Sequence, residues 1–248
     1  GMPEGLKLTR PLDENLAAIE AGRRLVEQHN CAGCHIIEGE GGDISPTLTE
    51  WLEDTKGYSD EEAASMTPVF APPKLMGEGK KVQSAWLFDF LHAPEVIRPW
   101  ISVRMPTYAF TDDQRNALAK YFSALDEEPF PFFATTRPEP ESAQYTAGKT
   151  LFSKDYFDCA NCHIQGDIFP AGEADRWAPD FALSARRLKP EWLKQWLYDP
   201  QVLEPGTKMP TYFDPESFDD AGSDDVLDGD EHQHILALRD YVFGIALE

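Results

Sequence analysis

Large apolar side chains recur at helical spacing in two corresponding stretches of the chain. In each stretch they occupy positions i, i+1, i+4 and i+5, which lie on one face of an α-helix. A proline follows each stretch, and we expect Pro94 and Pro200 to stop the two helices. No alternation of apolar and polar residues predicts a strand, so the expected fold class is all-α. The two matching strings are Trp86-Leu87-x-x-Phe90-Leu91 and Trp192-Leu193-x-x-Trp196-Leu197.

Other short strings also occur twice and in the same order, which predicts an internal duplication. One pair of strings resembles the capping box that starts a helix, and each member precedes the last helix of its copy. The matching pairs are Ala21-Gly22-x-x-Leu25 with Ala147-Gly148-x-x-Leu151, Thr111-x-x-Gln114 with Asp230-x-x-Gln233, and Leu118-x-x-Tyr121 with Leu238-x-x-Tyr241.

A proline-rich stretch separates the two copies and is typical of a stiff linker. We therefore expect a first domain at residues 1–127, a linker at 128–144 and a second domain at 145–248. The linker also contains Phe130, Phe132 and Phe133, which predicts that it packs at the domain junction.

The copies differ in length at two places. The first copy has 24 extra residues, which we place between about Trp51 and Lys81. The second copy is longer near its end, where residues 214–230 include eight acidic residues and no Lys or Arg.

Four cysteines form two pairs of identical spacing, and a histidine follows each pair directly. Cys-x-x-Cys-His is the attachment motif of c-type haem. Two thiols at this spacing can each form a thioether with a haem vinyl group, and the adjacent imidazole can bind the iron. We therefore predict two covalently bound haem c groups. The motifs, which use every cysteine, are Cys31-Ala32-Gly33-Cys34-His35 and Cys159-Ala160-Asn161-Cys162-His163.

Paired cysteines also occur in zinc ribbons, structural disulfides and thioredoxin-like dithiols. A ribbon separates its pairs by roughly 15–20 residues, whereas Cys34 and Cys159 are 125 positions apart. A redox dithiol needs no histidine directly after its second cysteine, and no βαβ pattern surrounds either motif. Haem attachment accounts for the cysteines and the histidines together.

A methionine follows each haem motif within the same short string. A thioether ligand opposite the histidine favours Fe(II) and leaves no open position for a substrate. A single methionine is more often a core residue, but its recurrence at corresponding places favours ligation. We expect His35 and Met105 to bind the first iron, and His163 and Met209 to bind the second. The strings are Arg104-Met105-Pro106-Thr107-Tyr108 and Lys208-Met209-Pro210-Thr211-Tyr212.

The charge balance limits the partners of this chain. It has 44 acidic and 22 basic residues, for a net charge of -22. This charge disfavours nucleic acid and anionic membranes, which bind through Lys and Arg. It favours redox partner proteins with a basic docking face. No apolar run approaches the roughly 20 residues of a membrane-spanning helix, so we expect no span here and place any signal or anchor outside this sequence.

Together these motifs resemble the class I cytochromes c over nearly the whole chain, twice. The resemblance implies an all-α fold of two tandem class I cytochrome c domains. It also implies that a glycine of the first helix packs against an aromatic residue of the last helix in each domain. The corresponding pairs are Gly22 with Tyr121 and Gly148 with Tyr241.

In this family a loop proline carbonyl typically accepts the Nδ1 hydrogen of the iron-ligating histidine, which orients the ring. Pro46 is the corresponding residue for His35 and Pro179 for His163. Pro72 is an alternative to Pro46, because Ala71-Pro72 also resembles Ala178-Pro179.

The resemblance implies an electron carrier rather than an enzyme. The carrier is expected to be free, or to form the electron-transfer part of a larger respiratory redox complex, in the bacterial periplasm or another extracytoplasmic compartment. The alternative is a dihaem enzyme, such as a cytochrome c peroxidase or a thiosulfate-oxidising cytochrome. Such an enzyme needs an open or displaceable distal position at one haem, and the two Met-Pro strings argue against it.

Overall fold

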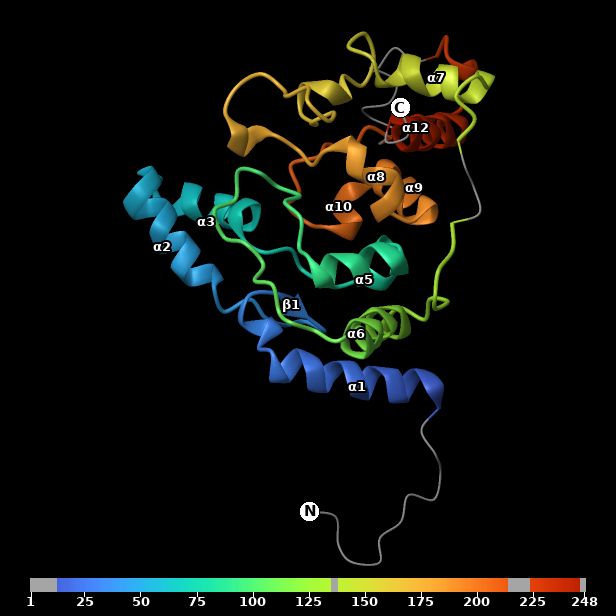
Figure 1. Cartoon of the computed structure of the whole chain (residues 1–248). Coiled ribbons are helices and arrows are strands. Elements are labelled where there is room, and N and C mark those ends of the chain that lie inside the picture. Colours follow the sequence, from blue (N-terminus) through green and yellow to red (C-terminus); the bar gives the residue numbers. More distant parts are fainter. Residues whose placement is uncertain (1–12, 135–137, 214–223, 246–248) are drawn as a thin grey trace, which may run out of the picture.

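The computed structural model describes residues 13–134, 138–213 and 224–245, and this part of the chain is mostly helical (Figure 1). Its first half contains α1 Glu14–Gln28, β1 Ile36–Ile37, β2 Glu40–Gly41, α2 Ser45–Lys56, α3 Asp60–Phe70, α4 Glu78–Lys81, α5 Ser84–His92 and α6 Asp112–Leu125. Its second half contains α7 Ala143–Phe152, α8 Ser184–Arg187, α9 Pro190–Tyr198, α10 Pro200–Leu203 and α12 Glu231–Ile245. Single 3₁₀ turns lie at Cys31–Gly33, Cys159–Asn161, Ala174–Arg176, Phe181–Leu183 and Leu227–Gly229.

Several helix ends lie where the sequence predicts them. At the start of α6, the Thr111 side chain accepts a hydrogen bond from Gln114 N, and the Gln114 side chain accepts one from Thr111 N. At the start of α12, Asp230 Oδ1 accepts from Gln233 N at 2.8 Å. Helices α5 and α9 each end two residues before their proline. Local capping chemistry and proline placement therefore set these boundaries.

A short antiparallel hairpin is the feature that the helical prediction missed. Ile36 pairs with Gly41 and Ile37 pairs with Glu40. The turn between the strands needs positive φ angles at Glu38 (52°) and Gly39 (87°). Two-residue strands are too short to show the alternation by which strands are predicted.

Two helix pairs pack closely, α1 against α6 and α7 against α12 (Figure 1). Glycines make both approaches possible. A Cβ at Gly22 would lie 2.1 Å from Tyr121 Cγ, and a Cβ at Gly148 would lie 2.1 Å from the Ala237 carbonyl oxygen and 2.9 Å from Tyr241 Cβ. These distances confirm the close glycine–aromatic packing that the resemblance implies.

Two apolar clusters form the main cores, and a smaller one lies between α2 and α3. The first core includes Trp86, Leu87 and Leu91 of α5 with Leu118, Tyr121 and Phe122 of α6. The second core includes Leu151 and Phe152 of α7, Leu193 and Leu197 of α9, and Leu238 and Val242 of α12. The small cluster of Leu52, Ala63 and Phe70 lies within the part of the chain where we expected the extra residues of the first copy.

The two halves meet at equivalent positions, just before α5 and just before α9. Two backbone hydrogen bonds join them, and each half donates one of these bonds and accepts the other. Each half also places a cation over a tryptophan of the other, at a distance typical of a cation–π contact. The contacts are Gln83 N to Arg187 O at 2.8 Å, Lys189 N to Lys81 O at 2.9 Å, Lys81 Nζ at 5.4 Å from the Trp192 ring, and Arg187 Cζ at 5.2 Å from the Trp86 ring.

The described part of the proline-rich stretch packs against this junction. Phe130 lies on the first core, and Phe132 N donates to Ser84 Oγ at 2.9 Å. Lys189 Nζ lies 4.6 Å from the Phe132 ring, while Phe133 is 75% exposed. The expected packing is thus confirmed for two of the three phenylalanines. Residues 214–223, most of the predicted acidic stretch, lie outside the described residues.

Candidate haem-binding sites

The two Cys-x-x-Cys-His motifs fold into the same local turn. The residue before each first cysteine has a left-handed backbone, with φ of 50° at Asn30 and 46° at Asp158. Asn and Asp tolerate this conformation better than most residues. A 3₁₀ turn follows, and the backbone N–H of each histidine donates to the carbonyl of the first cysteine, at 2.9 Å for His35 and 3.1 Å for His163.

The ring of each histidine is oriented by a proline carbonyl. Nδ1 lies 2.7 Å from Pro73 O in His35 and 2.8 Å from Pro179 O in His163. A carbonyl oxygen only accepts, so Nδ1 carries the hydrogen and Nε2 keeps the lone pair. Burial is the main cause that lowers the pKa of both histidines and favours the neutral ring. A neutral imidazole oriented in this way is the form that ligates a metal.

The proline expected for His163 is the one found, but the expectation for His35 is wrong. The acceptor is Pro73, and neither Pro46 nor Pro72 makes this contact. Pro46 is the second residue of α2, where its carbonyl takes part in the helical pattern of hydrogen bonds.

A second backbone contact explains why the true match lies one residue beyond Pro72. Leu75 N donates to Ile36 O, and Phe181 N donates to Ile164 O, both at 2.9 Å. In each half the donor lies two residues after the proline that contacts the histidine. The pattern of proline, any residue and a large apolar residue separates Pro73 from Pro72, but Pro46 shares it, because Leu48 stands two residues after Pro46.

Each candidate methionine ligand packs against the same apolar core as the first cysteine of its motif. Met105 and Cys31 both lie partly buried against the first core. Met209 and Cys159 both lie partly buried against the second core. The fold therefore brings residues 74 and 50 positions apart to one apolar environment in each half.

The environment of the first cysteine in each motif disfavours its thiolate form. Burial is the main cause that raises the pKa of the Cys31 thiol, and it raises that of Cys159 to about 12. Zinc binding and thiol–disulfide exchange both use the thiolate. Among the described residues, no group of three or more His, Cys, Asp or Glu side chains is placed to hold a metal ion. The residues of both motifs fit covalent haem attachment with a histidine ligand.

Three cationic side chains, Lys81, Arg98 and Arg187, form a cluster at the junction of the halves. Arg98 donates to Ala71 O at 2.7 Å, close to the contact between Pro73 and His35. Burial lowers the pKa of all three cations, and the nearby Arg187 helps to lower that of Arg98 to about 10. The cluster therefore favours neighbouring anions, and Glu78 supplies one, with its Oε2 at 3.9 Å from Lys81 Nζ. Sequence reasoning missed it, because its members come from three separate segments.

Some buried donors, from separate segments of the chain, have no hydrogen-bond partner in the part of the protein that the structure describes. Arg187 Nε, Trp100 Nε1 and Trp177 Nε1 have no hydrogen-bond partner within the described residues. Trp177 lies just before Ala178-Pro179 in the sequence. An unsatisfied buried donor costs about 1–3 kcal/mol, so these three atoms fit a bound group that accepts hydrogen bonds.

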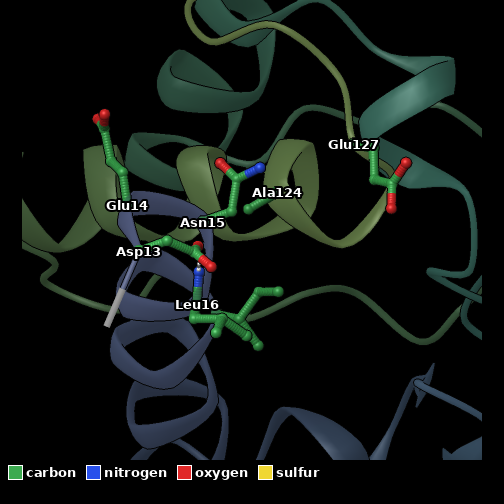
Figure 2. Close-up of a pocket in the computed structure, with 7 residues that line it drawn as sticks. Asp13, Glu14, Asn15, Leu16, Ala124 and Glu127 are labelled. Atoms are coloured by element: carbon green, nitrogen blue, oxygen red, sulfur yellow. Dashed lines mark hydrogen bonds between the residues drawn. The ribbon is translucent and has the colours of Figure 1, made fainter. Parts of the chain in front are cut away.

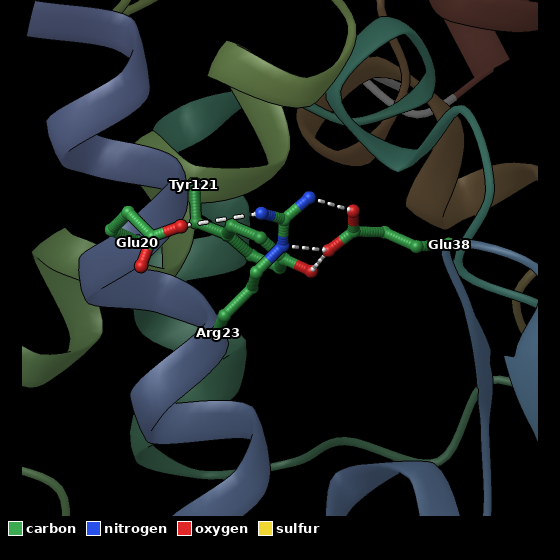
Figure 3. Close-up of polar contacts among 4 residues, drawn as sticks. All are labelled: Glu20, Arg23, Glu38 and Tyr121. Atoms are coloured by element: carbon green, nitrogen blue, oxygen red, sulfur yellow. Dashed lines mark hydrogen bonds and ion pairs between the residues drawn. The ribbon is translucent and has the colours of Figure 1, made fainter.

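A polar network anchors the hairpin that follows the first motif (Figure 3). Arg23 of α1 donates to both carboxylate oxygens of Glu38, from Nε at 2.9 Å and from Nη2 at 2.5 Å. The hydroxyl of Tyr121, in α6, donates to Glu38 Oε1 at 2.7 Å. Glu20 also contacts Arg23. Gly166 stands at the corresponding position after His163, so the second half has no such carboxylate there.

A cavity of about 540 Å³ lies away from both motifs, where the start of α1 meets the end of α6 (Figure 2). It contains none of the predicted haem residues, so it adds nothing to the haem sites. Its lining residues are Asp13, Glu14, Asn15, Leu16, Ile19, Ala124 and Glu127.

Comparison with known proteins finds a family match in the first half of the chain. Residues 19–126 match the family model of cytochrome c. This match supports the interpretation of the chain as a c-type cytochrome, which binds haem c covalently and transfers electrons. The match includes the first motif and Met105 and ends at the close of α6.

One relative is a subunit of a reductase. A nitric oxide reductase subunit of Halomonas halodenitrificans is 24% identical to this chain over 119 residues, which are 46% of the chain and 65% of the relative. The chain thus spans somewhat less than two thirds of that relative. No solved structure matches the chain. Within the described ranges, no helix has the length and apolar composition needed to cross a membrane.

Proposed function

We propose that this chain is a dihaem c-type cytochrome, with tandem cytochrome c domains at residues 1–127 and 145–248 joined by a linker at 128–144. The carrying observation is that both Cys-x-x-Cys-His motifs have the same geometry. In each, the histidine Nδ1 meets a proline carbonyl oxygen, at 2.7 Å and 2.8 Å. This repeated geometry extends the argument to the second half, which the family model does not cover.

The residues have the following proposed roles. The two cysteines of each motif form the thioethers, and His35 and His163 are the proximal ligands. Met105 and Met209 are the distal ligands, held at the cores by partial burial. Pro73 and Pro179 keep the imidazoles oriented. When bound, haem supplies a one-electron couple at its iron.

The cationic cluster and the unpaired donors support this proposal. Haem carries carboxylates, and Lys81, Arg98 and Arg187 offer positive charge near the first histidine, where Arg98 contributes to lowering the pKa of His35. Anionic groups beside these cations would offset their mutual repulsion.

We infer that the electron-transfer role belongs to a larger redox complex. The relative is, by its name, part of a reductase, which favours this role over that of a free carrier. The net charge of -22 favours partners with a basic docking face. An extracytoplasmic location, as is usual for bacterial cytochrome c domains, completes the proposal.

Mass and spectra test the proposal. Denatured protein from a host that matures c-type cytochromes should have the mass of the polypeptide plus two haems. Met105→Ala and Met209→Ala should each remove about half of the far-red sulfur-to-iron band of the ferric protein. Met76→Ala is the matched control, because Met76 is 55% exposed. A mass with one haem would refute the dihaem proposal. If one of the two variants leaves the band untouched, the methionine that it replaces is not a ligand.

A further inference from the structure

One side chain of α10 holds the loop that carries Met209. Gln201 Nε2 donates to the carbonyl oxygens of Thr207 at 2.9 Å and Met209 at 3.2 Å. Its Oε1 accepts from Gly206 N at 3.1 Å. A single carboxamide therefore bridges three backbone groups over residues 206–209, including the backbone of the proposed ligand itself.

Gln201 projects from a well-fixed position. Asp199 Oδ1 caps α10 by accepting from Gln201 N at 2.9 Å and from Val202 N at 3.3 Å. The same oxygen accepts from Thr211 Oγ1 at 3.5 Å, beyond Met209 in the chain. Pro200 is fully buried, and its ring restricts the backbone just before Gln201. Both sides of the Met209 loop are thus tied to the start of α10.

The loop of Met105 has a different arrangement. Glu95 follows Pro94 as Gln201 follows Pro200, but its carboxylate accepts from Trp86 Nε1 at 2.8 Å and pairs with Arg186 of the other half. Arg104 Nη2 donates to Pro99 O at 3.2 Å. Among the described residues, no side chain donates to the Met105 carbonyl as Gln201 does to that of Met209.

We propose that Gln201 is a positioning residue for Met209, and that Met105 is consequently the more displaceable of the two distal ligands. Release of Met209 from iron requires its loop to move and the Gln201 hydrogen bonds to break, whereas release of Met105 does not carry this cost. An added neutral ligand therefore replaces Met105 at lower concentration than Met209. This inference rests on the proposed ligation of both irons.

Titration of the ferric holoprotein with imidazole, followed through the far-red sulfur-to-iron band, tests the inference. The band should disappear in two steps. Met105→Ala should lack the step at low imidazole, and Met209→Ala should lack the step at high imidazole. Gln201→Ala should move the second step to about tenfold lower imidazole, the scale of one or two lost hydrogen bonds. The first step should not move.

Two further variants isolate the cause. Gln195→Ala removes an exposed glutamine from neighbouring α9 and should leave both steps unchanged. Gln201→Glu keeps the acceptor for Gly206 N but loses both donors, so it should behave like Gln201→Ala. The midpoint of urea unfolding should fall slightly in both Gln201 variants, because each loses hydrogen bonds of the folded state, and it should stay unchanged in Gln195→Ala. A role limited to stability would lower that midpoint without moving the imidazole step.

The outcomes separate the two proposals. If Met209→Ala leaves the band intact, Met209 is not a ligand and the proposed function fails at that site. If Met209→Ala removes half of the band but Gln201→Ala titrates like Gln195→Ala, the ligation stands and the positioning role of Gln201 is refuted. A single step, or a first step assigned to Met209, refutes the predicted order of displacement.

Discussion

Gly148→Ala should destabilise the protein, because α7 and α12 touch at this glycine. The added Cβ would lie 2.1 Å from the carbonyl oxygen of Ala237, 2.6 Å from its carbonyl carbon and 2.9 Å from Tyr241 Cβ. Favourable contacts between carbon atoms lie at about 3.5–4.0 Å. The nearest atoms are backbone, so no side-chain rotation relieves the overlap and the helices must move apart.

The magnitude follows from two opposing effects. Overpacking a core costs about 1–3 kcal/mol, and a backbone obstacle places Gly148→Ala at the upper end of this range. Replacing glycine by alanine inside a helix stabilises it by about 1 kcal/mol. The net loss should therefore be about 2 kcal/mol. With a urea m-value of about 2 kcal/mol/M, the unfolding midpoint should fall by about 1 M.

Urea unfolding of the holoprotein, followed by circular dichroism, measures this change. Lys149→Ala is the matched control, because Lys149 is the next residue of α7 and is exposed. Its unfolding midpoint should stay close to that of the unchanged protein. A Gly148→Ala protein as stable as the control, or more stable by the helix-propensity effect, would show that α7 and α12 do not approach as described.

Two further predictions concern charge. Glu38→Gln should lower the free energy of unfolding by about 1 kcal/mol at pH 7. The hydrogen bond from Arg23 is the main cause that holds the pKa of Glu38 below its usual value of 4.5, so the ionised carboxylate stabilises the fold. The ionised carboxylate stabilises the folded protein, and this stabilisation is lost as the pH falls through the lowered folded-state pKa. The difference in unfolding free energy between Glu38→Gln and the unchanged protein, measured by urea unfolding, should therefore be smaller at pH 3 than at pH 7. An equal difference at both pH values would contradict the ionic contact. Electron exchange with a basic redox protein should slow as ionic strength rises, because exposed charges are screened beyond about 8 Å at physiological salt. Stopped-flow rates that do not change with salt would argue against a partner with a basic docking face.

Much of the local structure was predictable because its causes lie within a few residues. The Thr111 and Gln114 side chains cap α6 three positions apart, and the prolines stop α5 and α9 two residues beyond their last turns. The repeated apolar strings identified the helices that form both cores. The two Cys-x-x-Cys-His motifs fold into matching turns, because identical spacing of cysteine and histidine limits the local backbone.

Contacts between distant segments depended on tertiary structure. His35 meets Pro73, 38 positions away, across the segment that folds as α2 and α3. The distance along the sequence from the motif could not select Pro73 over Pro46 or Pro72. The path of the chain through α2 and α3 decides which proline carbonyl lies beside His35. Gln201 gives no sequence signal for a similar reason. Its carboxamide contacts three backbone groups, and the cap of α10 and the burial of Pro200 fix where it meets them. Backbone polar groups are alike in every sequence, so no residue type marks them as its partners.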